Sequence, residues 1–249
     1  MRSLVISAGV FICLLLGAFL GMAVRRKLPG HHVNTDSKDA VKIGMALIAT
    51  MAALVLSLLI ASTKASFDAQ NSEVRQMAAD LVMLDRLLGA YGPEAGEPRT
   101  MLRDTVREVV EGTWERGGSR VAIFGNPKIT SAALAILTKI EALPAADTPH
   151  ETIRAQAAEL IKSSGHTRWQ LVAQDDSSIQ TPFLAVLVFW LVILFASFGL
   201  FAPTNATVFI AFGVCAVSVA GALFLILELD RPFQGLMHIS SEPFRQVIE

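Results

Sequence analysis

The chain has 249 residues, of which 53% are hydrophobic and 17% are charged, and its 21 basic residues nearly balance its 22 acidic ones. So apolar a composition is typical of membrane proteins. The net charge is near zero and does not indicate the strongly basic composition of a nucleic-acid-binding domain, so we expect no nucleic-acid partner. Cys13 and Cys215 lie inside apolar stretches and predict neither a disulfide nor a metal site, and we expect no cofactor.

Four apolar stretches organise the chain, at residues 4–24, 43–63, 182–201 and 207–229. Each has about 20 residues, the length with which an α-helix crosses a hydrocarbon core of about 30 Å. The first stretch has an alternative interpretation as a signal peptide because Gly21-Met22-Ala23 resembles a cleavage site. Its length and the basic residues that follow it favour a retained span.

The sequence therefore predicts an all-α, multi-pass integral membrane protein. Residues 1–65 form a first transmembrane hairpin and residues 181–230 a second one. Residues 66–180 form a helical extramembrane domain between them, and residues 231–249 a C-terminal tail, which lies on the membrane surface or packs on that domain.

The extramembrane domain shows helical periodicity throughout. Apolar residues recur at steps of three and four over residues 66–90, without a break after the second span, and Gly92-Pro93 ends this helix. Further helices are predicted at residues 100–114 and 130–143. Thr148-Pro149-His150-Glu151 predicts a capping box with Thr148 as the cap, and Gly165 the end of that helix.

Small side chains recur along the second span. The candidate positions are Ala46, Ala49, Thr50, Ala53 and Ser57. Small residues at this spacing let helices approach closely in lipid, and they also suit the wall of an aqueous pore. The residues alone favour packing over a pore by about two to one. Gly17 and Gly21 in the first span, and Gly213, Ala216, Ala220 and Gly221 in the fourth, predict further helix contacts.

A polar cluster of Glu228, Asp230 and Arg231 ends the fourth span. Acidic groups close to hydrocarbon are costly unless they are paired or hydrated. Glu228 and Arg231 are three residues apart and can form a helical ion pair. The alternatives are a polar ring at the mouth of a conduit, or an anchor for helix ends of the extramembrane domain.

The chain contains no catalytic or nucleotide-binding motif, so we expect that it is not an enzyme. We interpret His31-His32 as a solvated loop pair rather than a metal site.

The orientation in the membrane is not decided by the lysine and arginine residues near the span ends. The first loop has five of them and the opposite side has six, among them Arg168.

The segment Glu228-Leu229-Asp230-Arg231-Pro232-Phe233-Gln234-Gly235 resembles the acidic-Pro-Phe-Gly signature that closes the last span of bestrophins. The chain as a whole, including Thr35-Asp36-Ser37-Lys38-Asp39-Ala40-Val41 and the segment from Leu84 to Pro93, is similar to a bacterial group called bestrophin-like. Two departures stand out: the second span lacks the aromatic constriction of bestrophins, and the calcium-binding acidic cluster of animal members is missing.

Bestrophins are pentameric, mainly anion-conducting channels with a pore lined by the second span. The resemblance implies a homo-oligomer in the inner membrane, a cytosolic helical domain, and permeation of small ions along Ala46, Ala49, Thr50, Ala53 and Ser57. The alternative is a non-conducting scaffold or sensor, in which the small residues only join helices and the helical domain binds a partner.

Overall fold

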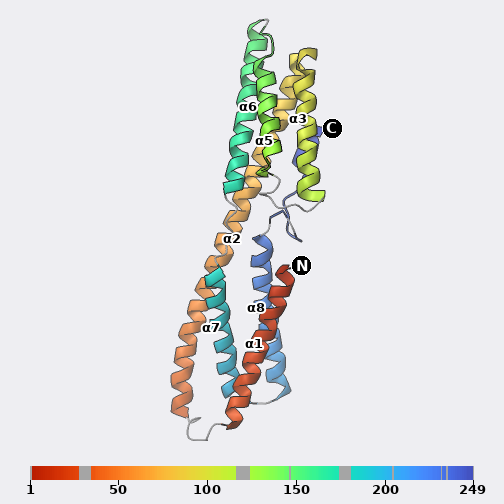
Figure 1. The fold of residues 1–249 in the computed structure, drawn as a ribbon. Helices are drawn as coiled ribbons and strands as arrows, with labels where there is room; N and C mark the ends of the chain where they lie inside the picture. Colours follow the sequence, from red (N-terminus) through yellow and green to blue (C-terminus); the bar gives the residue numbers. More distant parts are fainter. Residues whose placement is uncertain are drawn as a thin grey trace. The chain divides into compact units, whose positions relative to one another are not determined.

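The computed structural model describes residues 2–27, 35–115, 124–145, 147–173, 181–203, 205–230, 232–233 and 235–248. All of the secondary structure in these ranges is helical (Figure 1), which confirms the all-α prediction. Four helices are long and apolar enough to cross a membrane, as predicted. They are α1 (Arg2–Lys27), α2 (Thr35–Tyr91), α7 (Thr181–Phe201) and α8 (Ala206–Leu229).

The chain divides into two compact units. The membrane unit comprises Met1–Ser66 and Ser178–Asp230, and the helical unit comprises Phe67–Ser177 and Arg231–Glu249. The continuous helix α2 contributes its first part to the membrane unit and its second part to the helical unit. The remaining helices of the helical unit are α3 (Gly96–Val110), α5 (Pro127–Glu141), α6 (Thr148–Ala173) and α9 (Glu242–Ile248), with short turns η2 (Pro93–Ala95) and η3 (Glu111–Glu115).

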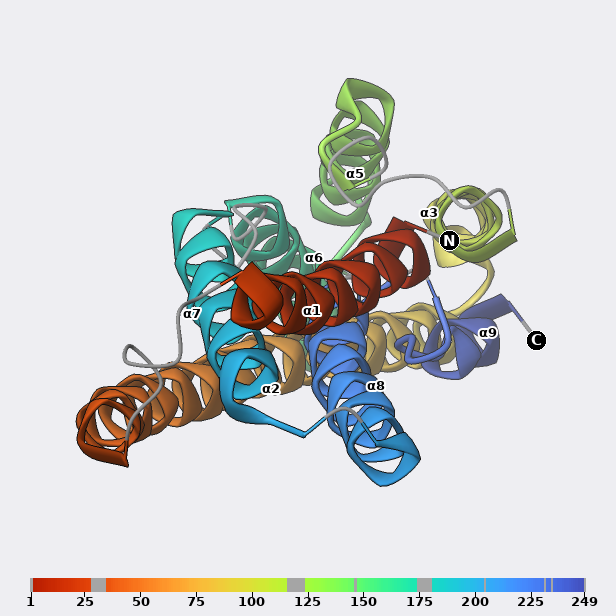
Figure 2. The same ribbon diagram turned by 90° about the horizontal axis from the view of Figure 1, so that it is seen from below.

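In the membrane unit, α1 packs along α7 and α8 (Figure 2). Glycines bring the backbones of α1 and α7 together, because a Cβ atom on Gly21 would lie 1.9 Å from the Ala196 carbonyl oxygen. A Cβ atom on Gly199 would likewise lie 2.1 Å from the Ala18 carbonyl oxygen. The contact predicted at Gly17 and Gly21 is therefore present, and its partner is α7.

The contact predicted for the fourth span is present only in part. Ala216 is fully buried in the core of the membrane unit. Gly213 and Gly221, by contrast, do not pack against another helix of the chain, because a Cβ atom added to either would have no atom within 4 Å. The small residues of α8 thus divide between an inner and an outer face.

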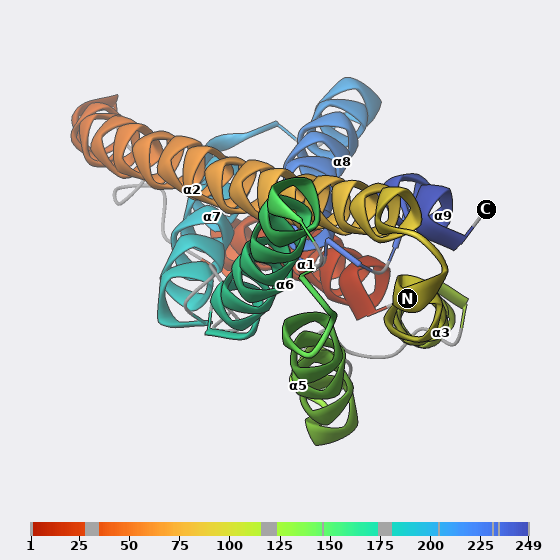
Figure 3. The same ribbon diagram turned by 90° about the horizontal axis from the view of Figure 1, so that it is seen from above.

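The helical unit has one apolar core to which α2, α3, α5, α6 and α9 all contribute (Figure 3). The stripe predicted on residues 66–90 lies in it, with Val74 and Leu84 fully buried. The C-terminal tail also belongs here, since Phe244 and Val247 of α9 are buried. Of the two placements that the sequence left open, the tail adopts the one on the helical unit.

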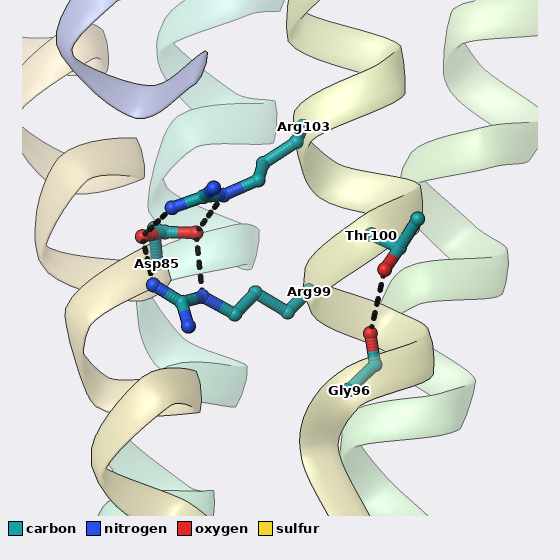
Figure 4. Close-up of polar contacts among 5 residues, drawn as sticks. All are labelled: Asp85, Gly96, Arg99, Thr100 and Arg103. Carbon is teal, nitrogen blue, oxygen red and sulfur yellow. Dashed lines mark hydrogen bonds and ion pairs between the residues drawn. The ribbon is translucent and has the colours of Figure 1, made fainter. Parts of the chain in front are cut away.

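Two buried aspartates attach neighbouring helices to α2. Asp85 accepts two hydrogen bonds from Arg99, both at 2.9 Å, and two from Arg103 at 2.8 and 3.0 Å, which fixes α3 (Figure 4). Asp80 accepts a hydrogen bond of 2.9 Å from the Ser163 hydroxyl of α6. Burial alone would raise the pKa of Asp85, but the hydrogen bonds and charges of Arg103 and Arg99 outweigh it and hold that pKa well below its usual range.

Two predicted helix boundaries were wrong. The carboxylate of Asp147, not Thr148, caps α6, since it accepts a hydrogen bond of 3.0 Å from the backbone N–H of His150. An aspartate one residue earlier is the better acceptor for the first turn. Helix α6 also continues through Gly165 to Ala173, because Ile161, Arg168 and Leu171 keep one face buried on both sides of the glycine.

Candidate functional site: the outer face of the second span

Helix α2 has three different faces within the membrane unit. Met45, Ala52 and Leu59 are buried, and Ala52 and Leu59 belong to the apolar core that α2 shares with the other spans. These residues are seven apart, so they keep nearly the same angular position on the helix. Among the four spans α2 is the least buried, so most of its surface is left for lipid or for other molecules.

The exposed surface of α2 divides by side-chain size. One side carries large apolar residues, among them Leu47, Leu54 and Leu58, which are each more than 60% exposed. Such a surface suits lipid acyl chains. The other side carries mainly small residues, although Ile60 is also exposed there, 42% of its surface, between the angular positions of Ala49 and Ala53 on the helix. If lipid surrounded both sides of α2, nothing in its environment would require large and small side chains to lie on different sides of the helix.

The five candidate positions lie on or beside this small-residue face. Ala46, Thr50, Ala53 and Ser57 are exposed, and Ala49 is half-buried at the boundary with the buried face. At 100° per residue, the four exposed positions fall within one narrow sector, about a third of a turn from the buried face. None of the five lies on the face that α2 directs toward the other spans of its own chain.

The two hydroxyl groups on the small-residue face differ in what they can offer. Thr50 donates its proton to the Ala46 carbonyl oxygen at 2.6 Å, so its oxygen is left as an acceptor. Ser57 makes no side-chain hydrogen bond within the described residues, and its hydroxyl can donate as well as accept. Ser57 is therefore the position on this face with a proton to offer an anion.

The polar cluster at the end of α8 lies partly within the described residues. Glu228 is buried, with 5% of its surface exposed, and has interaction partners. Asp230 is the C-terminal cap of α8, with its backbone N–H directed at the Ile226 carbonyl oxygen at 3.1 Å. Arg231 lies outside the described residues, as do His31 and His32. The predicted pair between Glu228 and Arg231 thus stays a prediction.

The Pro-Phe-Gly part of the signature has a structural role in the helical unit. Phe233 is buried there, with its ring 5.9 Å from Trp114 and 6.0 Å from Phe124. The Pro232 carbonyl oxygen accepts a hydrogen bond of 2.7 Å from Ile239, which closes the turn. Gly235 has a φ of 106°, a conformation that side chains disfavour. The signature thus forms a tight turn that holds the Phe233 ring in the core of the helical unit.

The sequence places Arg168 among the basic residues near a span end, whereas the structure buries it, with 6% of its surface exposed. A signal for this was present in the sequence. Ile161, Ser164, Arg168 and Leu171 follow one another at steps of three, four and three, which is the spacing of a buried helix face. No cluster of three or more potential metal ligands occurs in the part of the chain that the structure describes.

Comparison with known proteins gives one finding. Searches of curated proteins and of solved structures found no match. The model of the bestrophin-like domain, in contrast, matches residues 12–244, which include most of the first span, the other three spans, nearly all of the helical unit and the signature. The chain therefore belongs to the bestrophin-like family.

Proposed function

We propose that this protein is a homo-oligomeric channel of the bestrophin-like family, in which the small-residue face of α2 lines a path for small anions. The observation that carries the proposal is the division of the outer surface of α2 into a bulky apolar side and a side of mainly small residues. Family membership supports it, because bestrophin-like proteins are channels rather than enzymes.

A single chain is too small to enclose such a path. In the membrane unit the small-residue face points away from the buried face that meets the chain's other spans, so a closed wall requires further copies of α2. A ring of identical chains around an axis supplies them, because each copy then presents the same face inward. The bulky side, about 100° away on α2, then faces acyl chains.

The remaining parts of the proposal concern location. We place the ring in the bacterial inner membrane with the helical units in the cytosol, as the family resemblance implies. The first loop, with its five basic residues, then lies outside. Small anions are the proposed cargo because a donor such as the Ser57 hydroxyl favours negative charge. A ring of small side chains otherwise discriminates mainly by size.

The test combines particle mass with ion flux. Wild-type protein in lipid nanodiscs should form a single closed oligomer, and liposomes with the same protein should release chloride. Ser57→Leu should lower that flux at least tenfold and leave the mass unchanged. The matched control is Leu58→Phe, which also adds bulk but on the lipid-facing side, and it should leave both properties unchanged.

Two results would contradict the proposal. A wild-type protein that stays monomeric in lipid has no closed path. A Ser57→Leu protein that dissociates, while Leu58→Phe does not, would show that the small residues are a packing seam. That second result would favour the scaffold or sensor, in which the helical unit binds a partner.

A further inference from the structure

An open groove of about 400 Å³ lies on the helical unit between α2 and α9. Its middle is lined by apolar residues of α2, namely Ala79, Val82 and Met83, and α9 contributes Pro243 and Gln246. Met83 is a large apolar side chain that is 48% exposed. Scattered apolar residues on a surface need no explanation, whereas an apolar groove with polar residues at its rim is typical of an interaction site.

Two arginines of α2 also line the groove, Arg75 and Arg86, and both are exposed. Neither makes a hydrogen bond or an ion pair with the residues that the structure describes. Every other lysine and arginine of the helical unit within those residues has an interaction partner. The two arginines are 11 residues apart, about 16 Å along the helix. The groove therefore has an unpaired positive charge on either side of its apolar middle.

The complementary charges lie on another surface of the same unit. Helix α6 exposes Glu151, Ala155 and Glu159, which follow one another at steps of four and so lie along one side of the helix. Neither glutamate side chain has a partner within the described residues, whereas Glu97 and Glu108 of α3 are both paired with lysines. The two carboxylates of α6 are about 12 Å apart, with a small apolar residue between them.

The groove and the acidic side of α6 cannot belong to one contact within a single chain. Figure 3 shows α9 and α6 on different sides of α2, so the groove and α6 face different directions. A contact of the groove with the groove of a second copy would bring four arginines together, which like charges disfavour. A contact of the groove with α6 of a second copy pairs opposite charges. Because it joins two different surfaces it is heterologous, the kind of contact that closes a ring.

We propose that the groove between α2 and α9 binds α6 of a second copy of this chain. The two arginines of the groove then pair with Glu151 and Glu159, and Ala79 meets Ala155. The spacings of the two charge pairs differ by about 4 Å, which long arginine side chains can accommodate. This contact rests on the homo-oligomer proposed above, and it is the surface that joins the helical units of neighbouring copies. Its exposed charge pairs set the choice of surface more than the affinity.

Cross-linking between copies of the full-length protein tests this contact. Ala79→Cys and Ala155→Cys are made separately in a protein with Cys13 and Cys215 replaced by alanine, given different affinity tags, coexpressed and reconstituted in nanodiscs. Both positions lie near the middle of their surfaces, so the direction of α6 along the groove does not matter. A short bifunctional thiol reagent should join one protein of each kind into a covalent heterodimer. Either protein expressed alone should stay without cross-links.

Reversal of the charges tests the pairing. Arg75→Glu with Arg86→Glu in the first protein places like charges opposite each other, and we expect the yield of heterodimer to fall roughly tenfold. Glu151→Arg with Glu159→Arg in the second protein should restore it, which also shows that the reversed proteins are folded. The matched control is Arg107→Glu, because Arg107 is an exposed arginine of α3 that lies outside both surfaces, and the yield should not change.

The particle mass separates a failure of this contact from a failure of the proposed channel. A closed oligomer without heterodimer cross-links overturns the contact alone. So does a charge reversal in the first protein that the reversal in the second does not correct, or a homodimer of the Ala79→Cys protein, which would show that the groove meets itself. A wild-type protein that is monomeric in lipid overturns both proposals.

Discussion

Both the membrane unit and the helical unit consist of helices, but the helices within each unit are packed by different means. In the membrane unit, α1 and α7 approach so closely that glycines at positions 21 and 199 have no space for a side chain. In the helical unit, long apolar side chains fill a core, and buried aspartates on α2 fix the neighbouring helices. Close packing of backbones suits lipid, where burial of apolar surface drives nothing, whereas a core of long apolar side chains suits a unit surrounded by water, as we expect the helical unit to be.

The comparison also shows where each unit is incomplete. The membrane unit leaves the small-residue face of α2 without a partner in its own chain. The helical unit buries the Arg168 side chain, and no carboxylate of the described residues forms an ion pair with it. In our proposal further copies of α2 complete the membrane unit.

The largest effect is expected where the two backbones of the membrane unit meet. Gly21→Leu places a side chain where the Ala196 carbonyl already lies and forces α1 from α7, at a cost of about 3 kcal/mol or more. We expect loss of folded protein on size-exclusion chromatography in detergent. Gly9→Leu is the control on the same helix, because an added Cβ there meets no atom within 4 Å. Equal behaviour of the two variants would contradict the packing of α1 on α7.

In the helical unit the equivalent weak point is Asp85. Asp85→Asn leaves two guanidinium groups beside a neutral amide, and because both are partly exposed we expect a loss of about 2 kcal/mol rather than the 3–5 of a fully buried pair. Chemical denaturation in detergent measures this, with Trp190 of α7 replaced by Phe so that the intrinsic fluorescence comes from Trp114 and Trp169 of the helical unit. Asp104→Asn removes an exposed pair with Arg107 and should cost less than about 0.5 kcal/mol.

Acid should affect the helical unit through the same residue. The folded pKa of Asp85 is lowered, so its stabilising contribution is present above the unfolded pKa of about 4 and is lost as the pH falls toward the folded value. Stability of the helical unit should therefore decrease below about pH 4. The Asp85→Asn variant should show a smaller decrease over that range. An identical acid profile for both proteins would show that other carboxylates dominate.

The smallest effect is expected at Gly89, next to the same cluster. A Cβ atom there would lie 3.2 Å from the Arg99 guanidinium, the mobile end of a long side chain, so Arg99 must shift slightly. Alanine gains about 1 kcal/mol of helix propensity, and we expect the two effects nearly to cancel in Gly89→Ala. In the Asp85→Asn background Arg99 is free to move, so the same substitution should stabilise. A large loss in both backgrounds would rule out this interpretation of the glycine.

The sequence was sufficient for the features that depend on local pattern. Four apolar stretches predicted four spans, and Gly17 and Gly21 predicted a close helix contact, because length and side-chain size act locally. The partner of that contact, α7, could not be predicted, since it depends on tertiary packing. The cap at Asp147 and the continuation of α6 through Gly165 were missed because neighbouring residues and burial outweighed the local signals.

The candidate site shows the same limit. The small residues of α2 were found from their spacing, but which face they occupy relative to the rest of the chain required the structure. Asp85 and Arg103 are 18 residues apart, and nothing in their spacing indicates that they meet. The burial of Arg168 had a periodic signal in α6, but its unpartnered Nε–H is visible only in three dimensions.

The central claim, that the small-residue face of α2 lines an aqueous path, is tested most directly by chemical access. In a protein with Cys13 and Cys215 replaced by alanine, Ser57→Cys and Leu58→Cys are compared for reaction with a small, charged, membrane-impermeant thiol reagent. The account predicts that Cys at position 57 reacts and that the reaction blocks chloride flux, whereas Cys at position 58 stays unmodified in lipid. Protection of position 57 in reconstituted protein, or equal reaction at both positions, would contradict it.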